Sequence, residues 1–143
     1  MNKTKLISVS VVLSIVVLGL VAGASTARTQ VVNVSLTNYD ITFDPPVVHA
    51  GKVTVVSTND AHDLMHEIRI VKTDLPMDKL PLESDGSVDE DNAQLTTVAA
   101  IEDLDPGKSR AVTVELQPGR YVYFCNKHNH YLVGMRGEIN VQL

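Results

Sequence analysis

The sequence has a single cysteine, Cys125, among its 143 residues, so no internal disulfide can form. It also lacks an excess of positive charge, because 12 lysines and arginines stand against 17 aspartates and glutamates. A chain of this charge is a poor partner for nucleic acid or for an anionic membrane surface. Internal repeats and low-complexity segments are absent. The length suits one domain with its own core.

The first 24 residues have the composition of a secretory signal. Two lysines precede an apolar run over residues 6–20, and small residues follow it, so we expect cleavage after Ala24 or Ala27. Removing residues 1–24 takes away two lysines and no acid, which changes the net charge from −5 to −7. Because no basic stop-transfer cluster follows, we favour export to the periplasm or the extracellular space over a membrane anchor formed by residues 6–22.

After the signal, no helix pattern longer than a turn or two is present. Short segments with period-two alternation or β-branched residues recur instead, separated by turn residues. They predict an all-β domain over residues 31–143, an antiparallel β-sandwich of seven to eight strands. The predicted strands are residues 31–36, 41–48, 53–57, 66–71, 98–101, 111–116, 121–125 and 137–143.

Residues 72–97 interrupt the strand pattern. Their acidic residues are spread among two prolines and a glycine, which predicts a long polar loop with at most one helical turn. The acids lack the alternating spacing and the terminal glutamate of a calcium-binding loop, so we interpret the segment as solvated. These acids are Asp74, Asp78, Glu83, Asp85, Asp89, Glu90 and Asp91.

The stretch from Tyr121 to Met135 carries the most distinctive chemistry. Four residues separate Cys125 from His130, and four more separate His130 from Met135, on a loop between two predicted strands. A thiolate, an imidazole and a thioether are the ligand types of a mononuclear copper site for electron transfer. A free thiol in an oxidising compartment has to be buried, paired between chains or bound to metal, which favours a ligand role for this cysteine.

Such a site needs a second histidine, and His66 meets the requirement. By alternation it faces the same side as the two isoleucines of segment 66–71, at the first inward position of that strand. Tyr121, Tyr123 and Cys125 likewise share one strand face. If the tyrosine rings enter the core, the sulfur does too.

Together with His66, this loop resembles that of a cupredoxin, a small type 1 blue copper protein with the Cys-x4-His-x4-Met spacing of rusticyanin-like members. The resemblance implies a Greek-key β-sandwich that binds one copper ion per chain. It also implies that Cys125, His66 and His130 form a trigonal plane and that Met135 is a long axial ligand. The matching segments run in the family's order over nearly the whole mature chain: Phe43-x-Pro45, Ala50-Gly51, Asn59…His66-Glu67-Ile68, Leu104-x-Pro106-Gly107-Lys108-Ser109, Pro118-Gly119-x-Tyr121 and Cys125-x4-His130-x4-Met135-x-Gly137.

Two other histidines compete for the ligand roles. His62 precedes the alternating pattern, which ranks it behind His66. His128 lies two residues nearer the cysteine, and a ligand at that position would need an earlier methionine. His128 and Asn129 also occupy positions where relatives often carry Pro-Gly, which leaves the shape of the loop open.

Three residues are candidates for a shell of hydrogen bonds around the ligands: Asn59, Glu67 and Asn126. A carboxylate at position 67 would favour Cu(II), but the alternation turns the side chain of Glu67 toward solvent. The loop is expected to expose an imidazole edge of His130 within an apolar rim, where redox partners would dock transiently. The rim would be Tyr131, Leu132 and Val133, of which one or two could instead pack beneath the loop.

We therefore expect a monomer that transfers single electrons between extracytoplasmic redox partners through Cu(I) and Cu(II). The alternative is a copper-binding or delivery protein of the same fold, because Met65, His62 and His128 could exchange the metal. An enzyme is not expected. A nucleophilic Cys125 with His130 as its base would lack an orienting group and an oxyanion site.

Overall fold

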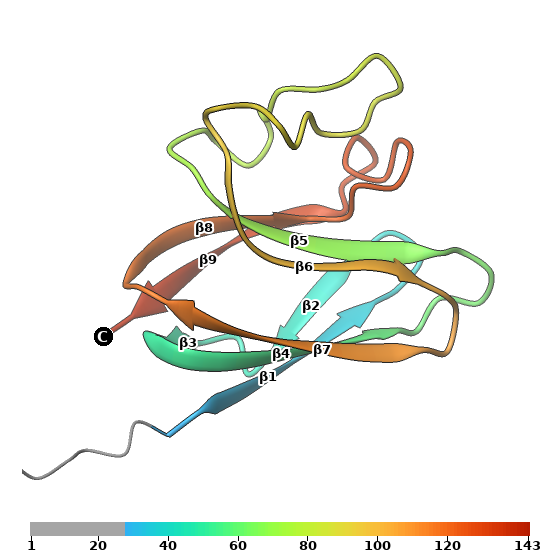
Figure 1. Cartoon of the computed structure of the whole chain (residues 1–143). Coiled ribbons are helices and arrows are strands. Elements are labelled where there is room, and N and C mark those ends of the chain that lie inside the picture. Colours follow the sequence, from blue (N-terminus) through green and yellow to red (C-terminus); the bar gives the residue numbers. More distant parts are fainter. Residues whose placement is uncertain (1–27) are drawn as a thin grey trace, which may run out of the picture.

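Nine strands in two sheets form this protein, as a computed structural model describes it for residues 28–143 (Figure 1). The predicted signal peptide, residues 1–24, lies outside the described residues. Within residues 28–143, no helix is long and apolar enough to cross a membrane. The strands are β1 (Gln30–Leu36), β2 (Ile41–Asp44), β3 (Val48–His49), β4 (Gly51–Asn59), β5 (His66–Lys72), β6 (Thr96–Leu104), β7 (Ser109–Leu116), β8 (Gly119–Phe124) and β9 (Arg136–Gln142).

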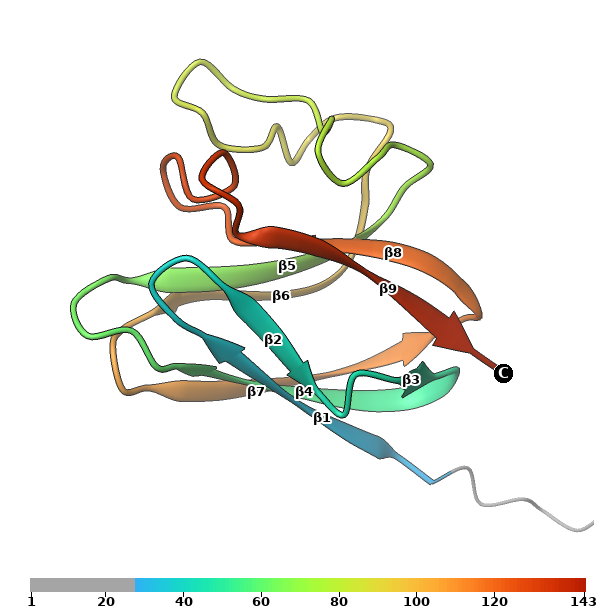
Figure 2. The same ribbon diagram turned by 180° about the vertical axis from the view of Figure 1, so that it is seen from behind.

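The two sheets pack face to face, with the order β2-β1-β4-β7 in the first and β3-β9-β8-β5-β6 in the second (Figures 1 and 2). This arrangement confirms the predicted all-β sandwich. Two pairings are parallel, β1 with β4 and β3 with β9, so the sheets are mixed rather than purely antiparallel. The predicted segment 41–48 forms two strands, because its adjacent prolines cannot donate ladder hydrogen bonds.

The core between the sheets follows the predicted alternation. On β8, Tyr121 is buried in this inner core, and Tyr123 packs against it from a partly buried position. Cys125, directly after β8, is fully buried in the same core. His66 is fully buried at the start of β5, and Ile68 follows it into the core. Two of the predicted metal ligands, His66 and Cys125, thus lie on the inner side of the second sheet.

A bulge where β5 begins to pair with β6 interrupts the alternation. His66 pairs with Leu104 and Ile68 pairs with Ile101, so β6 has one more residue than β5 over this stretch. An extra residue of this kind re-aims the neighbouring side chains. Glu67 is consequently buried, with 7% of its surface exposed. The expectation that its side chain turns to solvent is therefore wrong.

The connection from β5 to β6, residues 73–95, folds back over the outer face of the second sheet (Figures 1 and 2), and we call it the β5–β6 excursion. It contains turns and one isolated bridge between Leu82 and Val88, but no helical turn. Three of its apolar side chains are buried against β5, β8 and the loop after β8, so the prediction of a solvated loop is wrong for them. The resulting outer cluster comprises Val71, Leu80, Val88, Leu95, Val122, Phe124 and Tyr131.

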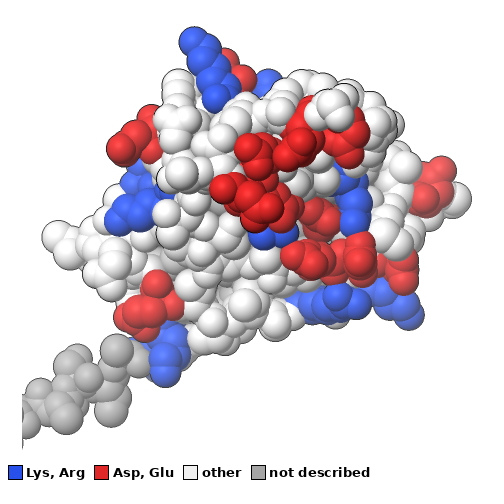
Figure 3. Space-filling view, turned by 45° about the horizontal axis from the view of Figure 1, so that its top comes forward, with Lys and Arg blue, Asp and Glu red and all other residues white. Residues whose placement is uncertain are grey.

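Most acidic side chains of the excursion are exposed. Figure 3 shows acidic groups gathered on this side of the molecule. In the part of the chain that the structure describes, the cluster of side chains able to hold a metal contains none of these acids. The exposed ones are Asp74, Asp78, Glu83, Asp85 and Asp91.

Candidate metal centre

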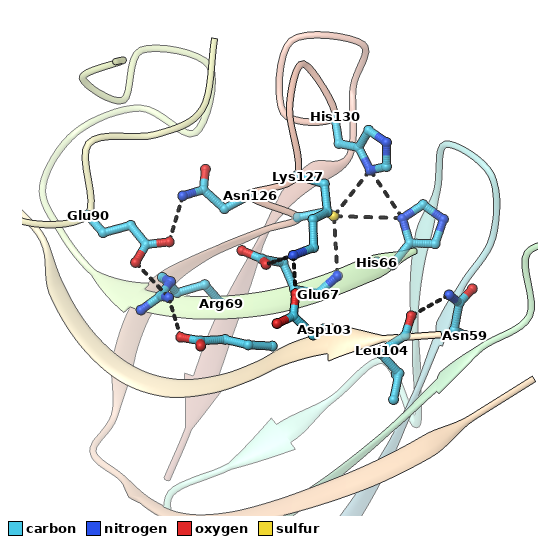
Figure 4. A network of polar contacts seen from close by, with 12 residues as sticks. Asn59, His66, Glu67, Arg69, Glu90, Asp103, Leu104, Asn126, Lys127 and His130 are labelled. Carbon is cyan, nitrogen blue, oxygen red and sulfur yellow. Dashed lines mark hydrogen bonds and ion pairs between the residues drawn. The ribbon is translucent and has the colours of Figure 1, made fainter. Parts of the chain in front are cut away.

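His66, Cys125 and His130 meet at one end of the sandwich (Figure 4). His66 begins β5, Cys125 directly follows β8, and His130 comes from the loop between β8 and β9. The Cys125 Sγ lies 3.7 Å from Nδ1 of His66 and 3.3 Å from Nδ1 of His130. The two Nδ1 atoms are 3.2 Å apart. Residues from two distant parts of the sequence, His66 and the loop with Cys125 and His130, therefore present their metal-binding atoms to one point.

The spacing of these three atoms fits a single metal ion. A point equidistant from them is about 2.0 Å from each, which is the length of a metal–imidazole bond in proteins. Two imidazole nitrogens and one sulfur are also the donor set of a trigonal copper site. The spacing of the donor atoms thus suits one metal ion, and their chemistry is that of a copper site.

Burial makes the three donors unequal. His66 and Cys125 are fully buried, whereas His130 is partly exposed. The ring of Tyr39, in the turn between β1 and β2, meets His130 edge-on with 6.4 Å between ring centroids. Of the three candidate ligands, His130 is therefore the one with contact to the surface.

Met135 is held next to the other candidate ligands by its backbone. Its carbonyl accepts a hydrogen bond from the Cys125 amide, and its own amide donates to the His130 carbonyl, both at 3.0 Å. Its side chain is fully buried in the inner core that also contains Cys125. These contacts are compatible with an axial thioether, and the ligand role of Met135 stays a prediction.

Both imidazoles are held neutral. Burial, with the charge of His130 adding to it, lowers the pKa of His66 from 6.5 to about 4. The backbone carbonyl of Thr37 acts in the opposite direction and raises this pKa. The Nε2 atom of His66 itself has no hydrogen-bond partner among the residues that the structure describes. Burial is also the main cause that lowers the pKa of His130, followed by the charge of Lys127. A neutral imidazole has a free lone pair, which is the form that binds a metal.

The thiol of Cys125 behaves differently. Burial raises its pKa, so the metal-free protein holds the sulfur protonated, and a metal ion has to displace that proton. The backbone amides of Glu67 and Lys127 oppose the shift because they point at the sulfur. The Glu67 nitrogen is 3.5 Å from Sγ. These two amides are placed to stabilise a thiolate.

His62 and His128 lie outside the three-residue cluster. Both are exposed, His62 in the loop before β5 and His128 in the loop after β8. Asn129 shows how the loop accommodates its unusual sequence, because its φ of 62° lies in the left-handed region, where glycine and asparagine are favoured. Its side chain leaves no room for a Cβ on Gly86 of the excursion, which would lie 2.5 Å from Oδ1.

Of the three residues predicted to form a hydrogen-bonding shell, Glu67 bonds to a candidate ligand, whereas Asn59 and Asn126 bond to other parts of the chain. The Nδ2 of Asn59 donates to the carbonyls of Leu64 and Leu104 at 2.8 and 2.7 Å, which fixes the loop that leads into His66. Glu67 contributes its amide to the sulfur, a contact that the sequence alone could not indicate because it depends on the bulge.

Asn126 and Tyr131 join the ligand loop to the excursion. Asn126 Oδ1 accepts a hydrogen bond from the Val88 amide at 2.6 Å, and its Nδ2 donates to the Val88 carbonyl at 3.0 Å and to Glu90 at 2.6 Å. The Tyr131 hydroxyl accepts a hydrogen bond from the Leu80 amide at 3.0 Å and donates one to the Met77 carbonyl at 2.9 Å. Both side chains of the loop are thereby anchored from outside the sheet.

The predicted apolar rim is only partly correct. Tyr131 is buried in the outer cluster and does not belong to a rim, whereas Leu132 and Val133 are 50% and 56% exposed. Two further apolar side chains on these loops are exposed, Tyr39 at 58% and Met65 at 41%. Met65 could have been found from its place before His66. Tyr39 could not, because only the fold brings the β1–β2 turn to His130.

Comparison with known proteins gives the same class of fold. The model of the copper binding proteins of the plastocyanin/azurin family matches residues 30–142. Reduced rusticyanin superposes with a TM-score of 0.60 at 21% sequence identity, covering 82% of this chain and 81% of that chain. Auracyanin B gives 0.56 at 24% identity, covering 80% and 89%.

A third similar structure is auracyanin A, described as a "blue" copper protein from the green thermophilic photosynthetic bacterium Chloroflexus aurantiacus. It has a TM-score of 0.57 and 19% identity, and the match covers 80% of this chain and 100% of that chain. At such identities the similarity demonstrates a shared fold. No curated protein matches the sequence.

Proposed function

This chain belongs to the plastocyanin/azurin family of copper-binding proteins, and on that premise we propose that it carries single electrons between redox partners outside the cytoplasm. In this proposal His66, Cys125, His130 and Met135 hold one copper ion. The observation that carries the proposal is the convergence of two neutral Nδ1 atoms and one sulfur on a single point. Copper supplies the one-electron change between Cu(II) and Cu(I).

The role of the chain is to keep the donors in one arrangement. His66 is fixed by β5, Cys125 follows β8, and the backbone of Met135 bonds to both Cys125 and His130. The two amides that point at the sulfur stabilise its thiolate form. A preorganised donor set needs little rearrangement when the charge of the bound ion changes, which favours fast electron transfer.

Electrons would enter and leave at His130, the partly exposed imidazole. Exposed apolar side chains belong to the same loop and to the loops that lead into the site: Tyr39, Met65, Leu132 and Val133. An apolar surface of this kind supports brief docking, since weak electron-transfer complexes have small interfaces. We propose a monomer with redox proteins as transient partners and with no affinity for nucleic acid.

Location outside the cytoplasm is supported by the signal-like composition of residues 1–24. An N-terminal segment that stays uncleaved would anchor the same domain to the membrane at residues 6–22. Both forms leave the copper site in the periplasmic or extracellular space.

Copper delivery is the second candidate function. The observation that favours it is the exposure of His62, Met65 and His128 on the loops around the site, where they could pass a metal onward. The buried positions of His66 and Cys125 favour retention instead. Nothing in the cluster requires an enzymatic role.

Redox cycling of the copper-loaded protein separates these functions. The protein is reduced and reoxidised repeatedly in the presence of a metal-free copper acceptor protein, and the copper in each fraction is then measured. A carrier regains its Cu(II) spectrum in each cycle and keeps its metal. Transfer of most of the copper to the acceptor would favour delivery and overturn the carrier proposal.

The choice of the first histidine has its own test. His66→Ala should abolish the intense visible absorption of the Cu(II) protein, because one of the three converging donors is lost. His62→Ala serves as the matched control, since His62 is exposed and outside the cluster, and it should keep that absorption. The reverse result would reassign the ligand.

A further inference from the structure

Glu67 and Lys127 form an ion pair directly beside the candidate ligands (Figure 4). The Lys127 ammonium lies 2.9 Å from Oε2 of Glu67 and 2.5 Å from Oδ1 of Asp103. The Glu67 side chain is 9% exposed, whereas that of Asp103 is 67% exposed. The lysine thus neutralises one buried carboxylate and one that water already screens.

Each partner of this pair is tied to a candidate ligand through the backbone. Glu67 follows His66, and Lys127 is two residues after Cys125. The backbone amides of both residues point at the cysteine sulfur. The backbone of both residues is therefore held next to the site.

The two charges act on the sulfur in opposite directions. The carboxylate of Glu67 disfavours negative charge on the nearby sulfur, whereas the ammonium of Lys127 favours it. A buried charge acts strongly on its neighbours because little water lies between them, whereas an exposed charge is screened. The pair thus places two opposite charges beside the sulfur, each acting against the other.

We propose that the Glu67–Lys127 pair controls the reduction potential of this site, with Lys127 cancelling a buried carboxylate that would otherwise favour Cu(II). This inference rests on the proposed copper function. Glu67 and Lys127 are positioning residues, since they act through their charges and their amides and not as ligands. Asp103 holds the lysine from the solvent side, where it adopts a left-handed φ of 47° at the bulge.

A purely structural role is the competing interpretation, because the pair also joins β5 to the ligand loop. The two roles differ in the sign of what they predict. Loss of either partner would weaken a structural bridge in the same way. An electrostatic role requires the two single substitutions to shift the reduction potential in opposite directions.

The test measures the reduction potential of copper-loaded variants at fixed pH, by redox titration followed in the visible absorption. Lys127→Met leaves the carboxylate uncompensated and should lower the potential. Glu67→Gln leaves the ammonium and should raise it. Each shift should reach about tenfold in the ratio of oxidised to reduced protein, or about 59 mV for a one-electron couple.

Three controls accompany these variants. The double variant Glu67→Gln/Lys127→Met should return close to the parent potential, and Lys127→Arg should retain it because the charge is kept. Asp103→Asn removes a carboxylate that contacts the same lysine but is exposed, so its shift should be several times smaller than that of Glu67→Gln.

Shifts of the two single variants in the same direction, or no shift in either, would overturn the proposal. If Lys127→Met does not fold, Glu67→Gln still decides, because it is nearly isosteric and must raise the potential. Thermal unfolding of the metal-free variants reports the structural contribution separately. The parent protein must still cycle reversibly, so failure of this inference is distinguishable from failure of the carrier function.

Discussion

The strand β8 is buried on both faces, and the two faces are covered in different ways. On the inner side, Tyr121 and the adjoining Cys125 pack into a core shared by two regular sheets. On the outer side, Val122 and Phe124 pack under the β5–β6 excursion, which has turns but no strand longer than an isolated bridge. The metal-binding loop leaves β8 between these two layers. It is therefore supported from inside by a sheet and from outside by a loop.

The comparison shows that the outer support depends on a small number of contacts. The excursion contributes three buried apolar side chains to the outer cluster. Asn126 and Tyr131 of the ligand loop add hydrogen bonds to its backbone. Because backbone order in such a segment comes from specific side chains, single substitutions should separate the two layers experimentally.

Removing the largest apolar contact of the outer cluster should have the largest effect. Phe124 is fully buried on the face that the excursion covers. Phe124→Ala should lower the free energy of unfolding by about 3–5 kcal/mol, because it loses buried apolar surface and leaves a cavity. Chemical denaturation of the metal-free protein measures this.

The matched control is Leu82→Ala in the excursion itself, where the side chain is 42% exposed, and it should change the free energy of unfolding by less than about 0.5 kcal/mol. If Phe124→Ala also costs less than about 1 kcal/mol, the excursion is not a second layer of the protein. The outer face of β8 would then be much less well packed than its inner face, in contrast to the structure.

Acid should weaken the inner face selectively. The pKa of His66 is about 4 in the folded protein and about 6.5 in the unfolded chain, so folding favours the neutral ring. The contribution of neutral His66 to the free energy of unfolding of the metal-free protein should therefore be fully present above pH 6.5. It should fall as the pH drops from 6.5 to 4, by about 3 kcal/mol in total.

Denaturation at a series of pH values measures this slope. His66→Leu should flatten it, whereas His62→Ala should keep it because that histidine is exposed. An unchanged slope in His66→Leu would show that other groups cause the acid sensitivity.

Loosening the outer clamp should have a smaller and more local effect. Asn126→Ala removes hydrogen bonds to Val88 and Glu90 and leaves the Val88 amide without its partner. The free energy of unfolding should fall by about 2 kcal/mol. The excursion should then be cut faster in limited proteolysis, with the inner core still protected. Asn92→Ala is the control, because the side chain of Asn92 bonds only to Asp89 and Gln94 within the excursion. Equal effects in both variants would contradict a clamp at Asn126.

Much of the inner face could be predicted from the sequence, because alternation alone assigns side chains to a strand face. It placed Tyr121 and His66 inward, and the structure agrees. Alternation gave the wrong side for Glu67 because of the bulge between β5 and β6. A bulge depends on how two strands pair, so the sequence of one strand does not reveal it. The burial of Glu67 and its pairing with Lys127 were therefore beyond a local pattern.

The outer face of β8 also has a signal in the sequence. Residues 121–125 are apolar at every position, and an uninterrupted apolar run indicates a strand buried on both faces. Such a run requires a cover, and residues 72–97 were the long segment available to supply it. The contact of Tyr39 with His130 had no such signal, because it joins two loops that only the completed sandwich brings together.

The central claim is that the inner face brings His66, Cys125 and His130 together around one copper ion. The visible absorption spectrum of the copper-loaded mature protein tests it most directly. The account predicts an intense blue absorption from the thiolate, which Cys125→Ser abolishes. A colourless Cu(II) complex, or a spectrum unchanged in Cys125→Ser, would contradict it.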